Sequence, residues 1–212
     1  MDTLKAQGVI TQRIFAMLFS NESYINSDKD SNSEVIIGDE AYAYMTDSLI
    51  YIPLQGEFHY WAVELTAVYL GLINLTISTQ IASFDSNSAV IRVPHTDYLA
   101  LIECLSAYGS CRSANLTRVI CDCFQYPAAL YPDLELTLGG HNVSLTYEDY
   151  FVQSNGECVL LVVQDEEVER WVLGTVVMRG RLVVFDMEGR KVGLGQISMA
   201  EAVEIAICLL FL

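Results

Sequence analysis

The residues whose types and order best suit chemistry stand in the stretch FDSNSAVIRVP, residues 84–94. Asp85 is followed there by Ser86, Asn87 and Ser88, which places hydroxyl and amide groups beside one carboxyl group. Such residues are ordinary turn formers between strands, and local composition alone favours that interpretation. The alternative is acid–base chemistry, in which two close carboxylates share one proton because both cannot ionise together. A lone aspartate supplies only half of such a pair.

Other common chemistries find no support in the sequence. It contains no G-x-S-x-G, no H-E-x-x-H and no glycine-rich phosphate loop. Cys121-Asp122-Cys123 does not have zinc-ribbon spacing, and the histidines cluster with no cysteine; they are His59, His95 and His141. The net charge of −16, with only 11 lysines and arginines, argues against a nucleic-acid partner. We therefore expect no metal, no cofactor and no nucleic acid.

Cysteine usage favours disulfide bonds and hence an oxidising compartment. The alternative is buried free thiols in a reducing compartment. The six cysteines are Cys104, Cys111, Cys121, Cys123, Cys158 and Cys208. Four N-x-S/T sequons agree with a secreted glycoprotein; they begin at Asn21, Asn74, Asn115 and Asn142. The first residues, MDTLKAQGVITQ, lack the features of a signal peptide, which predicts that the true amino terminus lies elsewhere.

The elements around these residues are predicted to be mostly strands, because β-branched and aromatic runs alternate with turn residues. Strands are expected within 33–39, 48–54, 60–71, 75–84, 89–94, 158–163 and 170–178. Hairpins are expected at 134–145, with a Gly-Gly corner, and at 181–195. Helical periodicity marks 95–105, after Pro94, and more weakly 11–19. Residues 21–33 are expected to form a polar loop.

The end of the chain differs from the rest. AEAVEIAICLLFL, residues 200–212, ends in an apolar run that is shorter than the roughly 20 residues of a membrane span, and Glu201 and Glu204 interrupt it. A packed terminal element, an interfacial segment and a misjudged reading frame compete as interpretations, and the last two are favoured together. We assign residues 1–196 to one domain and residues 197–212 to an apolar tail of open role, with no firm membrane span.

Taken in chain order, the motifs resemble the C-terminal lobe of pepsin-like aspartic proteases, the group that includes cathepsin D and the plasmepsins. The similar segments are QGVITQRIFAMLFS, EVIIGD, SLIYIPL with YWAVELTAVYLG, FDSNSAVIRVP, CFQYPAALYPDLELTLGG with LTYEDYFVQSNGEC, and WVLGTVVMRGRLVVFDMEGRKVGLG. Their order is preserved over about residues 7 to 195, nearly the whole chain. The resemblance implies one lobe of the pepsin-like fold, all-β with short helices.

The resemblance gives Asp85 the place of the second catalytic aspartate of the family. It implies that Ser86 replaces a threonine that braces two motif loops, and that Ser88 offers its hydroxyl to the outer carboxylate oxygen. Asn87 stands where the family has glycine, so a side chain takes up room beside the carboxylate. Asparagine does tolerate left-handed backbone better than most residues, so the loop need not be destroyed.

A second segment is implied to lie beneath that loop. Val172-Leu173-Gly174 matches the hydrophobic-hydrophobic-Gly element of the family. Thr175 replaces the usual aspartate there, which marks a relaxed constraint. Asp186 matches a structural turn position, so we assign it no catalytic role.

The resemblance also implies one disulfide bond, from Cys158 to a cysteine before Pro132. Cys123 is the nearer candidate and Cys121 is the alternative. Cys104 and Cys111 enclose the short loop LSAYGS and could close a local bridge, which geometry must decide. Cys208 is expected to be unpaired.

Three functional hypotheses follow. The first is an aspartic endopeptidase that acts on polypeptides, here with only its second catalytic motif and therefore inactive alone; no Asp-[Thr/Ser]-Gly occurs in the sequence. The second, motivated by Asn87 and Thr175, is a non-catalytic lobe that binds proteins or peptides. The third and least favoured is a homodimer that brings two copies of Asp85 together. The resemblance implies a secreted or an endolysosomal or vacuolar protein, which conflicts with the missing signal peptide and leaves localisation open.

Overall fold

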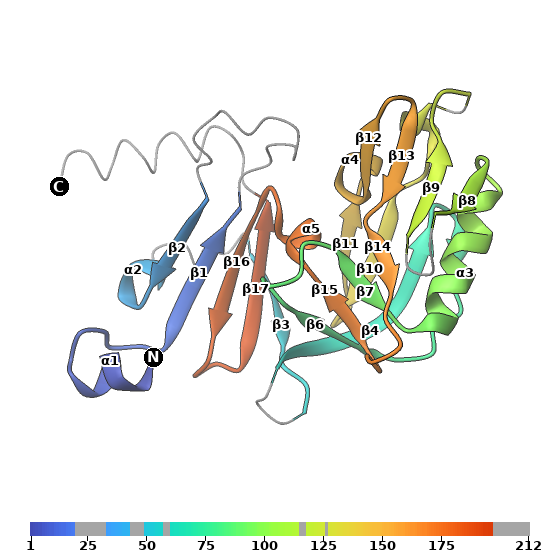
Figure 1. The fold of residues 1–212 in the computed structure, drawn as a ribbon. Coiled ribbons are helices and arrows are strands. Elements are labelled where there is room, and N and C mark those ends of the chain that lie inside the picture. Colours follow the sequence, from blue (N-terminus) through green and yellow to red (C-terminus); the bar gives the residue numbers. More distant parts are fainter. Residues whose placement is uncertain (20–32, 43–48, 57–59, 115–117, 126, 197–212) are drawn as a thin grey trace. The chain divides into compact units, whose positions relative to one another are not determined.

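The computed structural model describes residues 1–19, 33–42, 49–56, 60–114, 118–125 and 127–196. Strands dominate these residues and the helices are short (Figure 1), so the predicted all-β class with short helices is confirmed. Most of the polar loop expected at 21–33, and the whole apolar tail at 197–212, lie outside the described residues. None of the helices in the described residues has the length and apolar character needed to cross a membrane.

The chain divides into two compact units, one of residues 1–51 with 178–212 and one of residues 52–177. The first unit is built on a sheet with strand order β2-β1-β16-β17-β3, of which β3 reaches the boundary between the units. The elements of this unit are α1 (Asp2–Ala6), β1 (Ile14–Leu18), β2 (Glu34–Ile37), α2 (Asp39–Tyr42), β16 (Arg181–Asp186), β17 (Lys191–Gln196) and the first two residues of β3 (Ile50–Pro53). The hairpin expected at 181–195 is formed by β16 and β17.

The weak helical prediction for 11–19 is wrong, because these residues form strand β1. Ile14 and Ala16 are fully buried in the core of the unit, which shows the two-residue alternation of a strand. Neighbours on both sides complete the hydrogen bonding of β1, with Phe15 opposite Phe185 of β16 and opposite Ile37 of β2. Tertiary pairing therefore overrides a short pattern that fits either period.

The second unit is built around the long strand β4 (Trp61–Leu70), which pairs with β10 on one side and β6 on the other. Its main sheet has the order β11-β10-β4-β6-β15-β7-β14, with β5 attached to β4. These partners are β5 (Ile73–Asn74), β6 (Ile81–Phe84), β7 (Ile91–Val93), β10 (Leu134–Leu138), β11 (His141–Leu145), β14 (Val162–Gln164) and β15 (Trp171–Leu173). The hairpin expected at 134–145 is formed by β10 and β11, and Gly139 and Gly140 at its corner have positive φ.

A helix begins after Pro94, as the sequence predicts. Helix α3 (His95–Ser106) buries Tyr98, Leu101 and Leu105, and Figure 1 shows it in green beside β8. Asp97 in its first turn is also buried, and its carboxylate accepts hydrogen bonds from Trp171 Nε1 at 2.7 Å and from the Ser78 backbone N–H at 2.6 Å. This buried carboxylate ties α3 to strand β15.

A four-stranded sheet with the order β12-β13-β9-β8 completes the second unit. Its strands are β8 (Cys111–Ser113), β9 (Val119–Asp122), β12 (Phe151–Ser154) and β13 (Glu157–Leu160), and two short helices, η1 (Ala128–Leu130) and α4 (Tyr147–Tyr150), precede β12. A capping box between Thr146 and Asp149 starts α4.

Two of the expected strands are shorter than their apolar runs. Residues 158–163 divide between β13 and β14, which belong to different sheets. In the run 170–178 the strand ends at Leu173, and Thr175–Met178 form the short helix α5. Continuous apolar runs do not show where one buried element ends and the next begins.

Candidate active site

Asp85 lies at the end of β6 and begins a tight turn. Its backbone N–H donates to Leu173 O of β15 at 3.0 Å, and its own carbonyl accepts from the Ser88 N–H at 3.1 Å. The carboxylate oxygen Oδ1 accepts from the Asn87 N–H at 3.0 Å, as in an Asx turn. The side chain is 36% exposed. Asp85 therefore caps its own turn and still presents its carboxyl group to solvent.

Two neighbouring strands fix the start of this turn. Strand β6 pairs antiparallel with β4, where Trp61 stands opposite Phe84, and parallel with β15, where Leu173 stands opposite Phe84. Phe84 is buried, so the residue before Asp85 anchors the strand end in the core. The carboxylate thus projects from a sheet end that is held on both sides.

Ser88 does not make the hydrogen bond that the resemblance implies. Its side chain is buried, and its hydroxyl donates to Val90 O at 2.7 Å rather than to the carboxylate of Asp85. The backbone of Ser88 is held as well, because its carbonyl accepts from the Thr175 N–H at 2.8 Å. The implied role is corrected here: Ser88 stabilises the loop backbone in this structure.

Ser86 and Asn87 are both exposed at the tip of the turn. In the described part of the chain, the non-glycine residues with positive φ are Asn155 and Arg190. Asn87 therefore does not use the left-handed backbone that asparagine tolerates. The turn accepts asparagine in place of glycine with ordinary backbone angles.

Gly174 lies directly beneath the loop, as the resemblance implies for the segment Val172-Leu173-Gly174. These residues are buried. A Cβ atom on Gly174 would collide with the backbone carbonyl oxygens of Ser88 and Val90. Glycine is therefore required here by the close approach of two backbones rather than by its φ angle.

Arg92 is a charged neighbour of Asp85 that the sequence reasoning missed. Its Nη2 lies 3.4 Å from Asp85 Oδ2, and its Nη1 lies 2.9 Å from Asp165 Oδ2. Ile91 and Val93, which flank Arg92 in strand β7, are fully buried. Because successive side chains of a strand point to opposite faces, Arg92 lies on the other face of the sheet from these two residues. The available signal was a single arginine that interrupts the apolar run AVIRV after the motif.

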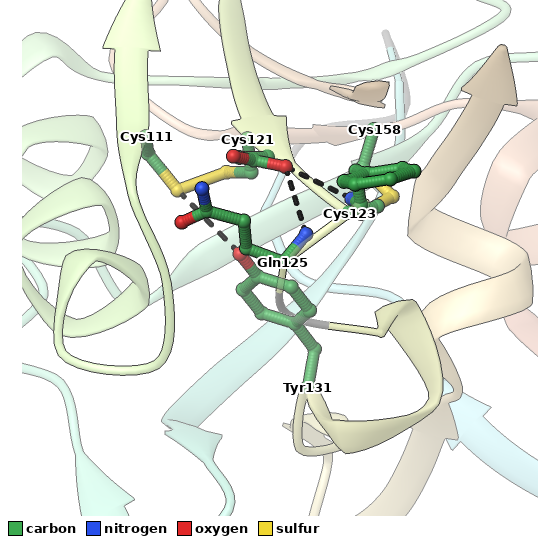
Figure 2. The surroundings of a disulfide bond; sticks show 8 residues. Cys111, Cys121, Cys123, Gln125, Tyr131 and Cys158 are labelled. Atoms are coloured by element: carbon green, nitrogen blue, oxygen red, sulfur yellow. Dashed lines mark hydrogen bonds between the residues drawn. A yellow bond between two sulfur atoms is a disulfide. The ribbon is translucent and has the colours of Figure 1, made fainter. Parts of the chain in front are cut away.

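Two disulfide bonds converge on Cys121-Asp122-Cys123 (Figure 2). Cys123, the nearer of the two candidates, is joined to Cys158, and this bond ties the turn after β9 to β13. Asp122 Oδ1 accepts from the backbone N–H groups of Phe124 and Gln125, at 2.9 and 3.1 Å, and so fixes the turn that carries Cys123.

The local bridge between Cys104 and Cys111 is not formed. Cys111 is joined to Cys121 instead, because antiparallel pairing of β8 with β9 places these residues directly opposite each other, with Cα atoms 4.0 Å apart. Cys104 lies on helix α3 and is a free thiol, and its pKa is raised by burial and by the negative charge of Glu103. Cys208 lies outside the described residues.

The remaining predicted positions are structural or lie apart from Asp85. Asp186 is buried at the end of β16, and its Oδ1 accepts from the Gly189 N–H at 2.6 Å, which closes the β16–β17 turn. A cavity of about 340 Å³ lies beside the disulfides and is lined by residues that include Arg112, Phe124 and Glu157, but not by Asp85. Among the described residues, no histidine, cysteine or acidic side chains gather in a group that could hold a metal ion.

The chain is similar to known proteins over nearly its whole length. The family model for eukaryotic aspartyl proteases matches residues 1–197. The chain belongs to the eukaryotic aspartyl protease family. Among curated members, pepsin A of Sus scrofa is 28% identical over 202 residues, which cover 93% of this chain and 49% of that protein. Pepsin A of Gallus gallus is 26% identical over 203 residues, which cover 93% of this chain and 50% of that protein.

This aspartyl protease chain therefore spans about half the length of the curated relatives that it matches. That share agrees with one lobe of a pepsin fold, as the resemblance implies. The matched range contains the loop of Asp85, the glycine beneath it and the cysteines of both disulfide bonds.

Proposed function

We propose that this chain supplies Asp85 as one of the two catalytic carboxylates of an aspartic endopeptidase. In that chemistry the ionised carboxylate activates a water molecule and the protonated one polarises the scissile carbonyl, and the pair titrates as a unit. The observation that carries the proposal is the position of Asp85. It stands on a turn fixed by Leu173 O and by the backbone contact above Gly174, with its carboxyl group part-exposed.

Because a single carboxylate performs half of this reaction, the chain alone is expected to be inactive. The test compares hydrolysis of an acid-denatured protein by the pure chain and by the chain refolded with the half of Sus scrofa pepsin A that it does not match. We expect no turnover by the chain alone and turnover by the mixture. Asp85→Asn, which keeps the shape but not the charge, should abolish that turnover.

The second candidate is a non-catalytic lobe that binds proteins or peptides. It is favoured by the hydroxyl of Ser88, which bonds to Val90 O, and by the guanidinium of Arg92 beside Asp85. Under this function, refolding with the missing half restores no cleavage, whereas an immobilised peptide library still retains the chain. Turnover by the pure chain that a statine-type inhibitor blocks would contradict the non-catalytic lobe and the expected inactivity of the chain alone, and it would support a homodimer with two copies of Asp85.

A further inference from the structure

Two carboxylates compete for one guanidinium at the loop of Asp85. Arg92 donates a hydrogen bond to each of them: its Nη1 lies 2.9 Å from Asp165 Oδ2, and its Nη2 lies 3.4 Å from Asp85 Oδ2. The side chain of Asp165 is 19% exposed and that of Asp85 is 36% exposed. The contact with Asp165 is thus the shorter and the less solvated of the two, and shorter charge-assisted hydrogen bonds are the stronger ones.

Asp165 is itself held by the backbone around it. Its N–H donates to Val93 O at 2.9 Å, which continues the parallel pairing of β14 with β7. Its Oδ1 accepts from the Glu167 N–H at 2.9 Å, and its Oδ2 is the oxygen that accepts from Arg92. The backbone and one carboxylate oxygen of Asp165 are therefore both hydrogen-bonded, and its other carboxylate oxygen accepts from Arg92.

We propose that Asp165 is a positioning residue that keeps the contact of the Arg92 guanidinium with the carboxylate of Asp85 single and long. This inference rests on the proposed function, in which the Asp85 carboxylate must be free to meet water and a second carboxyl group. Without the negative charge of Asp165, the guanidinium of Arg92 rotates toward Asp85. Two of its N–H groups then donate to the two oxygens of that carboxylate, in a bidentate ion pair.

The test measures how readily Asp85 reacts, not whether the chain cleaves peptides. A small aryl glycidyl ether is added to the full chain at neutral pH. A carboxylate oxygen attacks the epoxide CH2, the ring C–O bond breaks, and the ring oxygen takes a proton from water, which leaves a hydroxyalkyl ester. The rate of ester formation at Asp85 is followed by peptide mass spectrometry, with the exposed Glu103 in the same sample as an internal standard.

The inference predicts opposite effects for the two partners of the pair. Asp165→Asn keeps an oxygen for the Glu167 N–H but loses the charge, and it should slow labelling of Asp85 about two- to fivefold, the range that half-exposed ion pairs support. Arg92→Gln should speed labelling by a similar factor. The double variant should behave as Arg92→Gln alone, because without the guanidinium Asp165 has nothing to hold.

Controls separate this role from a loss of structure. Glu166→Gln removes one charge from an exposed position of the same loop and should leave the rate unchanged. Asp165→Glu restores the charge and should return the rate toward that of the native chain, and thermal denaturation checks that each variant is folded. Labelling that Asp165→Asn accelerates or leaves unchanged, or effects that simply add in the double variant, would overturn the inference. The assay measures labelling and not proteolysis. It therefore tests the role of Asp165 whether or not the proposed protease function holds.

Discussion

Gly174 packs directly against the backbone of the loop that follows Asp85, and a side chain at this position is expected to destabilise the fold. In Gly174→Ala the new methyl group meets the carbonyl oxygens of Ser88 and Val90, which belong to the backbone and cannot rotate away. We expect a loss of about 1–3 kcal/mol in the free energy of unfolding, measured by urea denaturation.

The matched control is Gly140→Ala, at a glycine with positive φ where an added Cβ meets no atom within 4 Å. That variant should lose only the cost of backbone strain, about 1 kcal/mol. Equal stability of Gly174→Ala and the native chain would show that the two backbones can separate without cost.

Cys104 carries the second prediction, which concerns pH. Burial, and to a smaller extent Glu103, raises the pKa of its thiol, so less of the reactive thiolate is present at a given pH. At about pH 8, alkylation of Cys104 by iodoacetamide should be slower in the folded chain than in urea, and its rate should level off at a higher pH. Peptide mass spectrometry identifies the site.

Glu103→Gln removes the smaller of the two causes, so its alkylation rate should level off at a lower pH than that of the native chain but still above that of the unfolded chain. Identical pH profiles for the folded and unfolded chains would contradict the burial of this thiol.

At the residue scale, the sequence indicated the place of Asp85 but not its neighbours. The order of motifs put Asp85 at a sheet end above Gly174, and the structure has it there. Arg92 and Asp165 meet only because β7 and β14 pair in parallel, and such a register between distant segments leaves no local pattern. The acceptor of the Ser88 hydroxyl is Val90 O, which depends on the folded turn and which no local pattern indicates.

At the element scale, the two disulfide bonds differ in the length of chain that they close, and this gives the third prediction. Cys123–Cys158 spans 35 residues and Cys111–Cys121 spans 10. In the loop-entropy model the longer loop contributes about 4 kcal/mol and the shorter about 3 kcal/mol to stability. The double variant Cys123→Ala/Cys158→Ala should therefore unfold at lower urea than Cys111→Ala/Cys121→Ala.

Each pair is the control for the other, since both bonds lie in the same sheet and both variants replace the same residue types. If Cys111→Ala/Cys121→Ala unfolds at lower urea than Cys123→Ala/Cys158→Ala, chain entropy does not govern the contribution of these bonds to stability.

The elements themselves were predictable where pattern and length agreed. Helix α3 and both hairpins follow from periodicity, Pro94 and the Gly139-Gly140 corner. β1 and α5 did not follow, because each lies in a short apolar run that is compatible with two periods, and sheet pairing makes the choice. The partner of Cys111 was missed for the same reason, since strand register decides it.

At the scale of the whole molecule, β2 is the end strand of its sheet in the described part of the chain, and it gives the fourth prediction. Val35 and Ile37 of this strand are 58% and 47% exposed, so an apolar edge is open to pairing with another chain. Val35→Lys should lower the fraction of oligomer in analytical ultracentrifugation, because a charged side chain on an edge strand opposes strand addition.

Glu34→Lys is the control, at the neighbouring exposed position that already carries a charge. It changes the net charge by more than Val35→Lys does but leaves the apolar edge intact, so it should reduce association less. A native chain that sediments only as monomer would show that this edge does not pair.

The meeting of both disulfides at Cys121-Asp122-Cys123 has a consequence for a chain exposed to other proteases. A single cut between residues 111 and 121, or between 123 and 158, leaves the two pieces covalently joined. Between residues 111 and 158, a cut separates the two pieces only at the two peptide bonds that flank Asp122. The Asp122 N–H donates to Ser110 O at 2.8 Å and its side chain fixes the following turn, which holds the backbone at these bonds in place. A molecule cut once within either of these two loops would therefore stay in one covalent piece until its disulfide bonds were reduced.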